Sequence, residues 1–272
     1  MAKLLADQAE GLRRLFAGER RRMVALVGSE QRDCGVAPKL AKALAAQRKK
    51  VLLLDESLTG GRWHDPLQVA VHYDLIDVML HGLEIDQALA KGVSGVDLIA
   101  GGENAARMES PTMESRIGLV NAFYRLAGYY DVVLVDALHS APVQRPSFVW
   151  ACEDVIVICA GDGHCATRAY AYIKAMQENG DRRFHLLFEQ VDSVRAHGLH
   201  RSLASVSRRH LQVMPESLGN IPDNDLFEAD FYQQLASALL RWPLPENKTG
   251  HFPALMRRLL ANPGDMRPAM VR

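Results

Sequence analysis

The amino-acid sequence predicts an α/β fold, with a mostly parallel, twisted sheet and helices on both faces. Short apolar runs recur along the chain, for example at 24–27, 51–55 and 130–136, without the polar alternation of a half-exposed strand. Segments with apolar residues at helical spacing separate these runs. Since alternating strands and helices build parallel sheets, and 272 residues suffice for one large core, a single main domain is expected.

Strands and helices alternate in the predicted order. Strands are expected at 24–27, 51–55, 96–100, 130–136, 154–159 and 184–191. Helices are expected at 36–47, 74–89, 115–128, 167–179, 198–210 and 225–240; Pro38 is compatible with the first because it falls in the first turn. The sequence therefore divides into an N-terminal segment at 1–22, an α/β domain at 23–242 and a C-terminal extension at 243–272.

Composition argues against several classes of protein. Lys plus Arg equals Asp plus Glu, at 32 each, so no overall field favours nucleic acid or an anionic membrane. Four cysteines, Cys34, Cys152, Cys159 and Cys165, lack the paired spacing of metal ligands, which predicts reduced thiols. No apolar stretch approaches the roughly 20 residues that span a bilayer, and the N-terminus lacks the pattern of a secretory signal. These observations predict a cytoplasmic protein.

The loop after the first predicted strand lies where a nucleotide-binding α/β domain carries its phosphate loop. Ligands of such sheets bind at the carboxyl ends of the strands. A phosphate loop uses glycine backbone N–H groups, a lysine for the phosphates and a hydroxyl for Mg²⁺. Residues 28–35 contain no Gly-Lys-Ser/Thr, and Glu30 and Asp33 place negative charge there. The fold is therefore expected to remain while the chemistry has been lost or altered.

Several motifs together resemble the MinD/ParA group of P-loop ATPases. In order they read VLLLDESL at 51–58, YDLIDVM at 73–79, GLEIDQALAKGVSGVDLIAGG at 82–102, YYDVVLVDA at 129–137 and AYAYIKAM at 169–176. Within that group, DQAEGLRRLF at 7–16 resembles the N-terminal signature of the FlhG or FleN regulators of flagellar number. The similarity extends from Asp7 to about Pro222 and implies a P-loop NTPase, MinD-like sheet.

The resemblance assigns a nucleotide site whose residues have largely changed. Its degenerate form comprises Gly28, Arg32, Asp33, Cys34, Asp55 and Asp136. Asp33 occupies the position of the phosphate-binding lysine, and Cys34 that of the Mg²⁺-binding threonine. Asp55 and Asp136 match the two acidic positions that remain at the ends of the second strand and of the Walker B strand.

Other positions of the same pattern are also altered. The second acidic residue after the second strand, implicated in positioning the attacking water, is Ser57 here. The glycine that senses the γ-phosphate is replaced by His139 or Ser140, and the asparagine beside the adenine falls at Glu189. The resemblance thus implies that the chain keeps the fold of the family but has changed most of the residues that bind and hydrolyse nucleotide.

The change from lysine to Asp33 decides the expected activity. At an effective dielectric constant of about 20, a unit pair near 4 Å is worth about 4 kcal/mol, and here its sign is reversed. We expect no catalytic residue, weak or absent ATP hydrolysis and no required cofactor. Mg-ATP or Mg-ADP binding in another pose, through Arg32 and the following helix N-terminus, stays open as the alternative. Asp55 and Asp136 are expected to hydrogen-bond adjacent backbone rather than hold Mg²⁺.

Other polar clusters favour structural interpretations. Cys165 beside His164 lacks an evident third orienting residue, so we do not expect a nucleophilic pair. His197 and His200 have no acidic or cysteine partner at ligand spacing, so we expect no metal site. The run 208–210, Arg-Arg-His, is typical of a helix C-terminus.

The N-terminal segment is the strongest candidate for a partner contact. The matching residues are Asp7, Gln8, Leu12, Arg13 and Phe16. In relatives, the resemblance implies, this signature contacts the GTPase FlhF and stimulates its GTP hydrolysis. A helix with apolar side chains and an arginine on one side is suited to docking in a groove. The alternative is a helix that folds back on its own domain.

The C-terminal extension contains an amphipathic pattern. Its apolar residues are Phe252, Leu255, Met256, Leu259 and Leu260. This spacing predicts a helix that lies on a membrane surface or packs on the protein body or a partner.

The resemblance implies a MinD-like regulator of flagellar number or placement that acts through protein contacts. Expected partners are an FlhF-like GTPase, a flagellar transcription regulator and a second copy of the chain, and no direct nucleic-acid contact is expected. Two alternatives stay open: an ATP-dependent dimerising MinD/ParA-type switch with an unorthodox site, and a pseudo-ATPase of cellulose or pilus assembly. Expected locations are the cytoplasm, the inner face of the plasma membrane and the cell pole.

Overall fold

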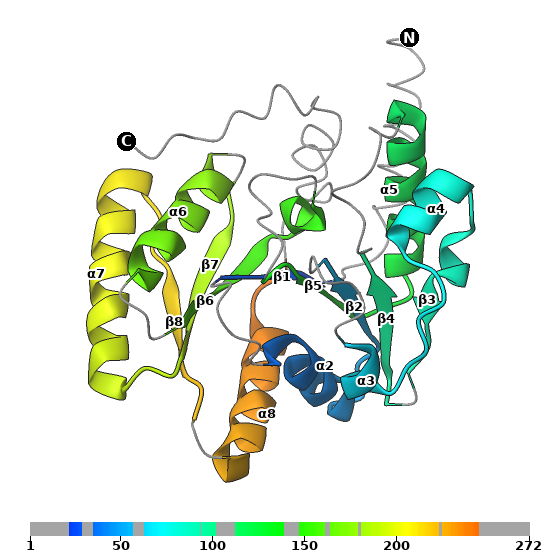
Figure 1. Cartoon of the computed structure of the whole chain (residues 1–272). Coiled ribbons are helices and arrows are strands. Elements are labelled where there is room, and N and C mark those ends of the chain that lie inside the picture. Colours follow the sequence, from blue (N-terminus) through cyan, green and yellow to red (C-terminus); the bar gives the residue numbers. More distant parts are fainter. Residues whose placement is uncertain are drawn as a thin grey trace.

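A computed structural model gives the fold (Figure 1). It describes residues 22–28, 35–56, 63–92, 94–101, 112–138, 147–160, 164–178, 181–222 and 225–244. The predicted N-terminal segment, most of the loop after the first strand and the C-terminal extension lie outside these residues.

The core of the molecule is an 8-stranded sheet in the order β3-β4-β2-β5-β1-β6-β7-β8. Its strands are β1 (Arg22–Gly28), β2 (Val51–Asp55), β3 (Leu89–Ala90), β4 (Val96–Ala100), β5 (Val132–Asp136), β6 (Asp154–Ala160), β7 (Arg183–Glu189) and β8 (Glu216–Asn220). Neighbouring strands are parallel except for the short antiparallel pair β3–β4. The four central strands, β2, β5, β1 and β6, are almost fully buried, which explains their continuous apolar sequences.

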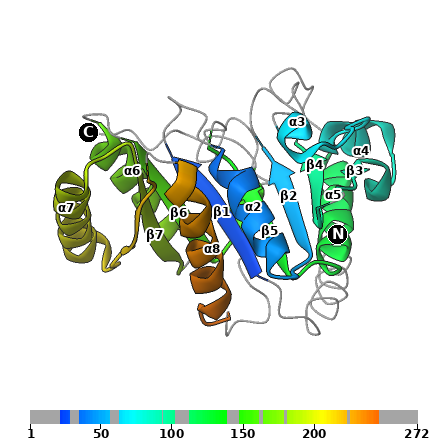
Figure 2. The same ribbon diagram turned by 90° about the horizontal axis from the view of Figure 1, so that it is seen from below.

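Helices cover both faces of the sheet (Figure 2). On one face lie α2 (Val36–Ala46), the short α3 (His64–Leu67) and α8 (Asp225–Arg241). On the other lie α4 (Leu75–His81), α5 (Met113–Ala127), α6 (Cys165–Gln177) and α7 (Ser193–Leu211), with the 3-10 turns η1 (Ile85–Gln87) and η2 (Phe148–Ala151). Alternate residues of one strand point to opposite layers: Ala25 and Val27 enter one core, and Val24 and Leu26 the other. The predicted fold class is confirmed.

One predicted helix, 74–89, is wrong in its extent. Asp74 caps α4 through bonds to the N–H groups of Ile76 and Asp77, but α4 ends at His81. Gly82 follows in a left-handed conformation, with φ of 66°, which terminates the helix. The remaining residues form η1 and the edge strand β3.

The edge strand β8 was absent from the predicted elements. Its sequence, ESLGN, is mostly exposed and lacks an apolar pattern. It forms because β7 offers a parallel neighbour, with His185 opposite Glu216. Pairing with an existing edge, rather than side-chain pattern, therefore defines this strand.

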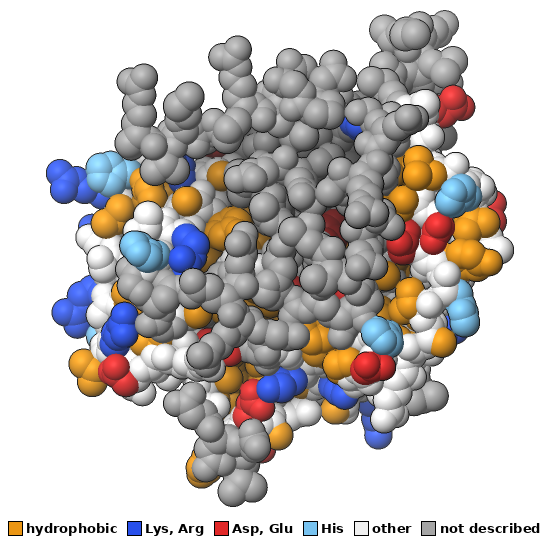
Figure 3. All heavy atoms as spheres, in the orientation of Figure 1, with side chains coloured by type: hydrophobic (Ala, Val, Ile, Leu, Met, Phe, Trp, Pro, Cys, Tyr) orange, Lys and Arg blue, Asp and Glu red, His pale blue; other side chains and the backbone are white. Residues whose placement is uncertain are grey.

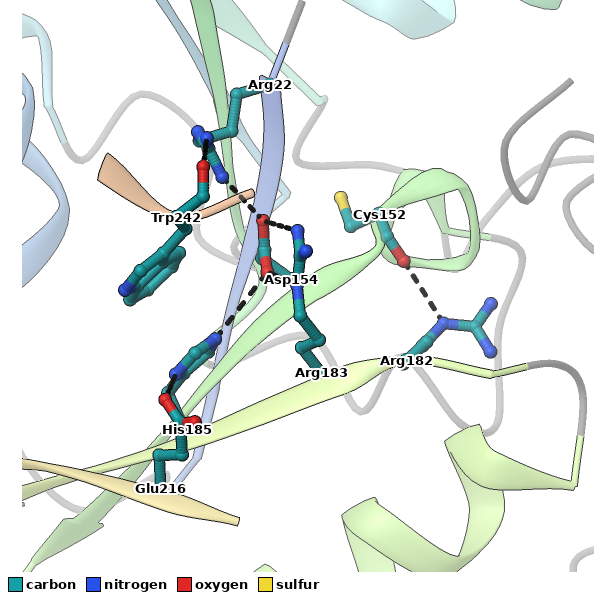
Figure 4. A network of polar contacts seen from close by, with 8 residues as sticks. All are labelled: Arg22, Cys152, Asp154, Arg182, Arg183, His185, Glu216 and Trp242. Carbon is teal, nitrogen blue, oxygen red and sulfur yellow. Dashed lines mark hydrogen bonds and ion pairs between the residues drawn. The ribbon is translucent and has the colours of Figure 1, made fainter. Parts of the chain in front are cut away.

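A buried ion network joins the amino ends of four strands (Figure 4). Asp154 begins β6 and is 1% exposed. It accepts hydrogen bonds from Arg22 at 3.1 Å and from Arg183 at 2.7 and 2.9 Å. His185 lies 3.5 Å from the same carboxylate and stacks on Trp242 with ring centroids 3.8 Å apart. Because Arg22 also donates to the Trp242 carbonyl at 2.5 Å, the network ties the end of α8 to the sheet.

Candidate functional site

The carboxyl ends of β1, β2 and β5 bring together three of the predicted site residues. β5 lies between the other two strands, with Asp136 opposite Leu26 on one side and Asp55 on the other. Gly28 closes β1 two residues beyond Leu26. The topology therefore places Gly28, Asp55 and Asp136 at one edge of the sheet, as the sequence predicted.

Gly28 is required by strand packing. A Cβ atom there would lie 2.5 Å from the carbonyl oxygen of Ile158 on β6. To relieve this clash, the backbone of β6 would have to move away from β1, which would separate the two paired strands. The glycine is therefore explained by the sheet itself and is no sign of a phosphate contact.

Asp136 is held by N–H groups of its own chain. Its carboxylate is fully buried, and one oxygen accepts a 2.6 Å hydrogen bond from the indole N–H of Trp63. The other accepts from the backbone N–H of Leu138 at 3.2 Å. Trp63 is 3% exposed and immediately precedes α3. Burying a carboxylate is costly unless donors replace its water, and these two groups supply part of that replacement.

A second carboxylate, Glu56, connects this edge to the start of η2. Glu56 follows β2, and its side chain accepts hydrogen bonds from the hydroxyl of Ser147 and from the N–H of Phe148, the latter at 2.7 Å. Burial raises the pKa of Glu56 to about 7, the two hydrogen bonds lower it, and the nearby Asp136 and Asp55 carboxylates raise it further. Three acidic side chains thus lie close together at the carboxyl ends of β2 and β5, and the pKa of one of them, Glu56, is near neutrality.

We expect Glu56→Gln to become increasingly stabilising, relative to the natural chain, as pH rises. The unfolded carboxyl ionises near pH 4.5 and the folded one near 7, so folding favours the proton and stability falls through that window. Gln can still accept from Phe148 and donate to Ser147. The stability difference should change by about 2–3 kcal/mol between pH 4.5 and 8, measured by urea unfolding. Glu178→Gln, at an exposed helix end, is the control. If stability depended on pH in the same way for Glu56→Gln and for the natural chain, the burial argument would be contradicted.

Other sequence candidates occupy varied surroundings. Glu189 ends β7 on the same rim and is 8% exposed. Cys165 is buried and is the first residue of α6, directly after His164. His197 contacts Arg201 at 3.2 Å, whereas His200 contacts the Pro215 carbonyl at 3.1 Å, so the two rings serve different partners.

The run 208–210 lies in the last turn of α7, as its sequence predicted. The remaining predicted positions lie outside the described residues. They are Arg32, Asp33 and Cys34 of the loop, the N-terminal residues Asp7, Gln8, Leu12, Arg13 and Phe16, and the C-terminal residues Phe252, Leu255, Met256, Leu259 and Leu260. Ser57, His139 and Ser140 are also outside.

Comparison with known proteins gives the context of this edge. No family model matches the chain. It is 27% identical to the antiactivator FleN of Pseudomonas aeruginosa over 248 residues, 84% of this chain and 89% of FleN. The cell division ATPase MinD of Pyrococcus furiosus superposes with a TM-score of 0.58 at 15% identity, covering 88% of this chain and 96% of MinD. The chain is thus similar in sequence to FleN and shares the fold of MinD.

A second solved structure extends the likeness to a nucleotide-bound protein. Cobyrinic acid a,c-diamide synthase from Mycobacterium smegmatis, with bound ADP and magnesium, has a TM-score of 0.59 at 21% identity. The match covers 81% of the FleN-like chain and 94% of the synthase. At this identity the likeness concerns the fold.

Two N–H groups satisfy part of the buried Asp136 carboxylate. The indole of Trp63 donates to one oxygen and the backbone of Leu138 to the other. An ionised carboxylate has about four lone pairs, so these two bonds leave others for a further ligand. Within the described parts of the chain, no group of three or more His, Cys, Asp or Glu side chains could hold a metal ion.

The sequence prediction missed Trp63, Glu56 and Ser147. Glu56 stood in the motif LLLDESL, and its position beside Asp55 was a usable signal. Trp63 carried no such signal, because it contacts a residue 73 positions away.

No helix in the described part of the FleN-like chain is long and apolar enough to cross a membrane.

Proposed function

We propose that this FleN-like chain regulates the number or placement of flagella through protein contacts, with weak or absent ATP hydrolysis. The observation that carries the proposal is its 27% identity to the antiactivator FleN over 84% of its length. The likeness to FleN supports the role in flagellar regulation. The match extends over 84% of the chain and is not confined to one motif.

The chemistry of the strand ends supports action without hydrolysis. Phosphoryl transfer depends on cations that neutralise charge developing on the transferred group. The FleN-like chain presents Asp55, Glu56 and Asp136 at this edge, and Asp33 replaces the expected lysine in its sequence. A bound triphosphate would add negative charge to a region that already holds three carboxyl groups. Electrostatics thus favours a protein whose output is binding.

We propose the N-terminal segment as the partner contact. Asp7, Gln8, Leu12, Arg13 and Phe16 match the FlhG/FleN signature, and the partner is an FlhF-like GTPase whose hydrolysis this segment stimulates. Leu12 and Phe16 supply apolar contacts and Arg13 a cationic group. A flagellar transcription regulator is the second proposed partner, since the relative is an antiactivator.

The full chain carrying Leu12→Ala and Arg13→Ala should stimulate the partner GTPase at least about tenfold less than the natural chain, because an apolar contact and a cationic contact are both removed. Release of phosphate from GTP by FlhF, with each full chain in excess, measures the effect. Lys3→Ala, outside the signature, is the control. Equal stimulation by the variant and the natural chain would rule out this segment as the stimulator.

An ATP-dependent dimerising switch is the second candidate function. The observation that favours it is the fold shared with a synthase solved with ADP and magnesium. In this case Asp136 would hold a hydrated metal through the lone pairs that its two N–H bonds leave free. Thermal unfolding of Trp63 and Asp136 variants, with and without nucleotide, distinguishes the two candidates.

A further inference from the structure

The charge of the chain is balanced overall and separated in space. Helix α7 contains Arg195, Arg201, Arg208 and Arg209 and no Asp or Glu between Ser193 and Leu211. All four arginines are exposed. Figure 3 shows Lys, Arg and His side chains gathered at the edge of the molecule where Figure 1 places α7. We call this the basic edge.

The opposite end of the sheet carries the opposite charge. Residues 63–90 contain no Lys or Arg and include Asp65, Asp74, Asp77, Glu84 and Asp86. Figure 3 shows Asp, Glu and hydrophobic side chains at the edge where Figure 1 places α4. We call residues 73–87, which include α4 and η1, the acidic edge. A chain with 32 cations and 32 anions is therefore bipolar across its sheet.

The two edges differ in how many of their charged side chains already bind groups of the same molecule. On the acidic edge, Asp74 caps α4 and Asp77 lies 3.3 Å from His81. Glu84 takes part in the capping box of η1, but both it and Asp86 are exposed. On the basic edge, Arg201 contacts His197. Glu84 and Asp86 are thus the acidic groups best placed to meet a partner.

Neighbouring elements reduce each charge without reversing it. The exposed Arg125 of α5 and Lys91 lie near the acidic edge, since α4 and η1 pack on α5 and Lys91 follows β3. Asp192 caps α7, and Glu216 lies on the adjacent β8. Four arginines against these two acids leave the basic edge positive.

Both edges also expose apolar side chains. Tyr73 is 44% and Leu80 49% exposed on the acidic edge. Val194 is 84% and Val206 41% exposed on the basic edge. Arginine and exposed apolar groups together are typical of protein interfaces, where a charge pair fixes the register and apolar contact adds affinity.

We propose that copies of this chain associate edge to edge, with α7 of one copy against α4 and η1 of the next. The two edges lie at opposite ends of the strand order, beyond β8 and beside β3, so they cannot meet within one molecule. They can meet between two, where arginines face carboxylates with the planar geometry that suits both. Each copy of a pair keeps one free edge, so the contact is head-to-tail and lets further copies add.

The same surface is less suited to nucleic acid. The chain has no net charge, and its acidic edge would repel phosphates. Helix α7 contains no Phe, Tyr or Trp on which a base could stack. A second copy is the occupant that supplies both the acidic groups and the apolar contact.

Association should depend on salt and concentration and need no nucleotide. At low ionic strength the average mass measured by sedimentation velocity should rise steadily with concentration, because a head-to-tail contact adds further copies. At about 0.5 M salt the Debye length falls to a few Å, and the chain should be monomeric. A monomer at every concentration in low salt would overturn the proposal.

Charge reversal gives the decisive test. Arg201→Glu with Arg208→Glu should weaken association at least about tenfold, and Glu84→Lys with Asp86→Lys should do the same, since each puts like charges on both edges. Mixing these two variants should restore association, because each supplies the edge that the other lacks. A single chain with all four changes should also associate.

Control variants test whether the contact is specific to these two edges. Arg48→Glu with Lys50→Glu makes the same change of net charge at an exposed turn and should leave association unchanged. Circular dichroism and thermal unfolding establish that each variant is folded. Failure of the mixed variants to associate, or binding of a 20-bp DNA duplex by α7 in a chain that stays monomeric without it, would overturn the proposal.

Discussion

Asp154→Asn is expected to lower the free energy of unfolding by about 3–5 kcal/mol, because it leaves buried cations without their counter-charge. Arg22 is 4% exposed and Arg183 is half-buried, and both donate to the Asp154 carboxylate. An Asn side chain keeps the shape of Asp154. However, its NH₂ group would face one of the guanidinium groups, so two donors would meet where a carboxylate oxygen now accepts. The loss should spread to α8, whose end is tied to Arg22 through the Trp242 carbonyl.

The pH dependence of this effect has a defined sign. Burial alone would raise the pKa of Asp154, but hydrogen bonds from His185 and Arg183 and the charge of Arg183 hold it below its ordinary value. A carboxyl with a lowered pKa contributes stability above its unfolded pKa, about 3.9, and loses it as pH falls through the folded value. Urea unfolding at pH 7 should show the full difference and at pH 3 a smaller one. Asp181→Asn, exposed after α6, should cost little at either pH, and a constant difference for Asp154→Asn would contradict the ion-network account.

Most of the sheet was predictable because its strands are buried on both faces. A run such as Val51 to Asp55 has no exposed side, so its sequence is apolar up to the terminal aspartate and its limits match those of β2. Residues 74–89 misled the prediction because apolar residues at helical spacing continue past Gly82. The glycine adopts φ of 66°, which ends the helix, and β3 then forms by pairing with β4. β8 was missed because strand pairing, and not apolar pattern, defines it.

Part of the candidate site was predictable for a topological reason. Parallel strands end at one edge, so residues that end two neighbouring strands must meet there, and Asp55 and Asp136 do. The contact of Trp63 with Asp136 joins a loop to a strand 73 residues away and follows no local pattern. The pKa of Glu56 likewise depends on burial and on Ser147, 91 residues away.

These contacts give Asp136 a structural role. A buried carboxylate must be satisfied by donors whether or not it also faces a metal. Trp63 and Leu138 supply N–H groups at the two oxygens. Selection on folding alone then suffices to keep an aspartate at the end of β5, so its presence does not indicate catalysis.

Trp63→Phe and Asp136→Asn are each expected to lower the free energy of unfolding by about 2–3 kcal/mol, because each disrupts a buried hydrogen bond to a charged group. The two residues share the 2.6 Å bond, so the double variant should cost less than the sum, with a coupling of about 1–2 kcal/mol. Urea unfolding of the four chains measures it. Trp242→Phe combined with Asp136→Asn is the control pair. Trp242 lies at the amino ends of the strands and Asp136 at a carboxyl end, so the effects of these two changes should add. Coupling near zero between Trp63 and Asp136 would show that the indole does not hold the carboxylate.

The same variants decide between a binding protein and an ATP switch. With millimolar Mg-ATP or Mg-ADP present, we expect the midpoint of thermal unfolding of the natural chain to stay unchanged, since Asp33 stands in place of the phosphate-binding lysine and three carboxyl groups lie where the strands end. A nucleotide at about 100 times its dissociation constant would add about 2.7 kcal/mol, an effect well within measurement. If the natural chain gained that stability, Trp63→Phe should gain at least as much by freeing an oxygen, and Asp136→Asn should lose it. That pattern would establish Asp136 as a metal neighbour and support the ATP switch; an unchanged midpoint in all four folded chains leaves protein contact as the way in which this domain acts.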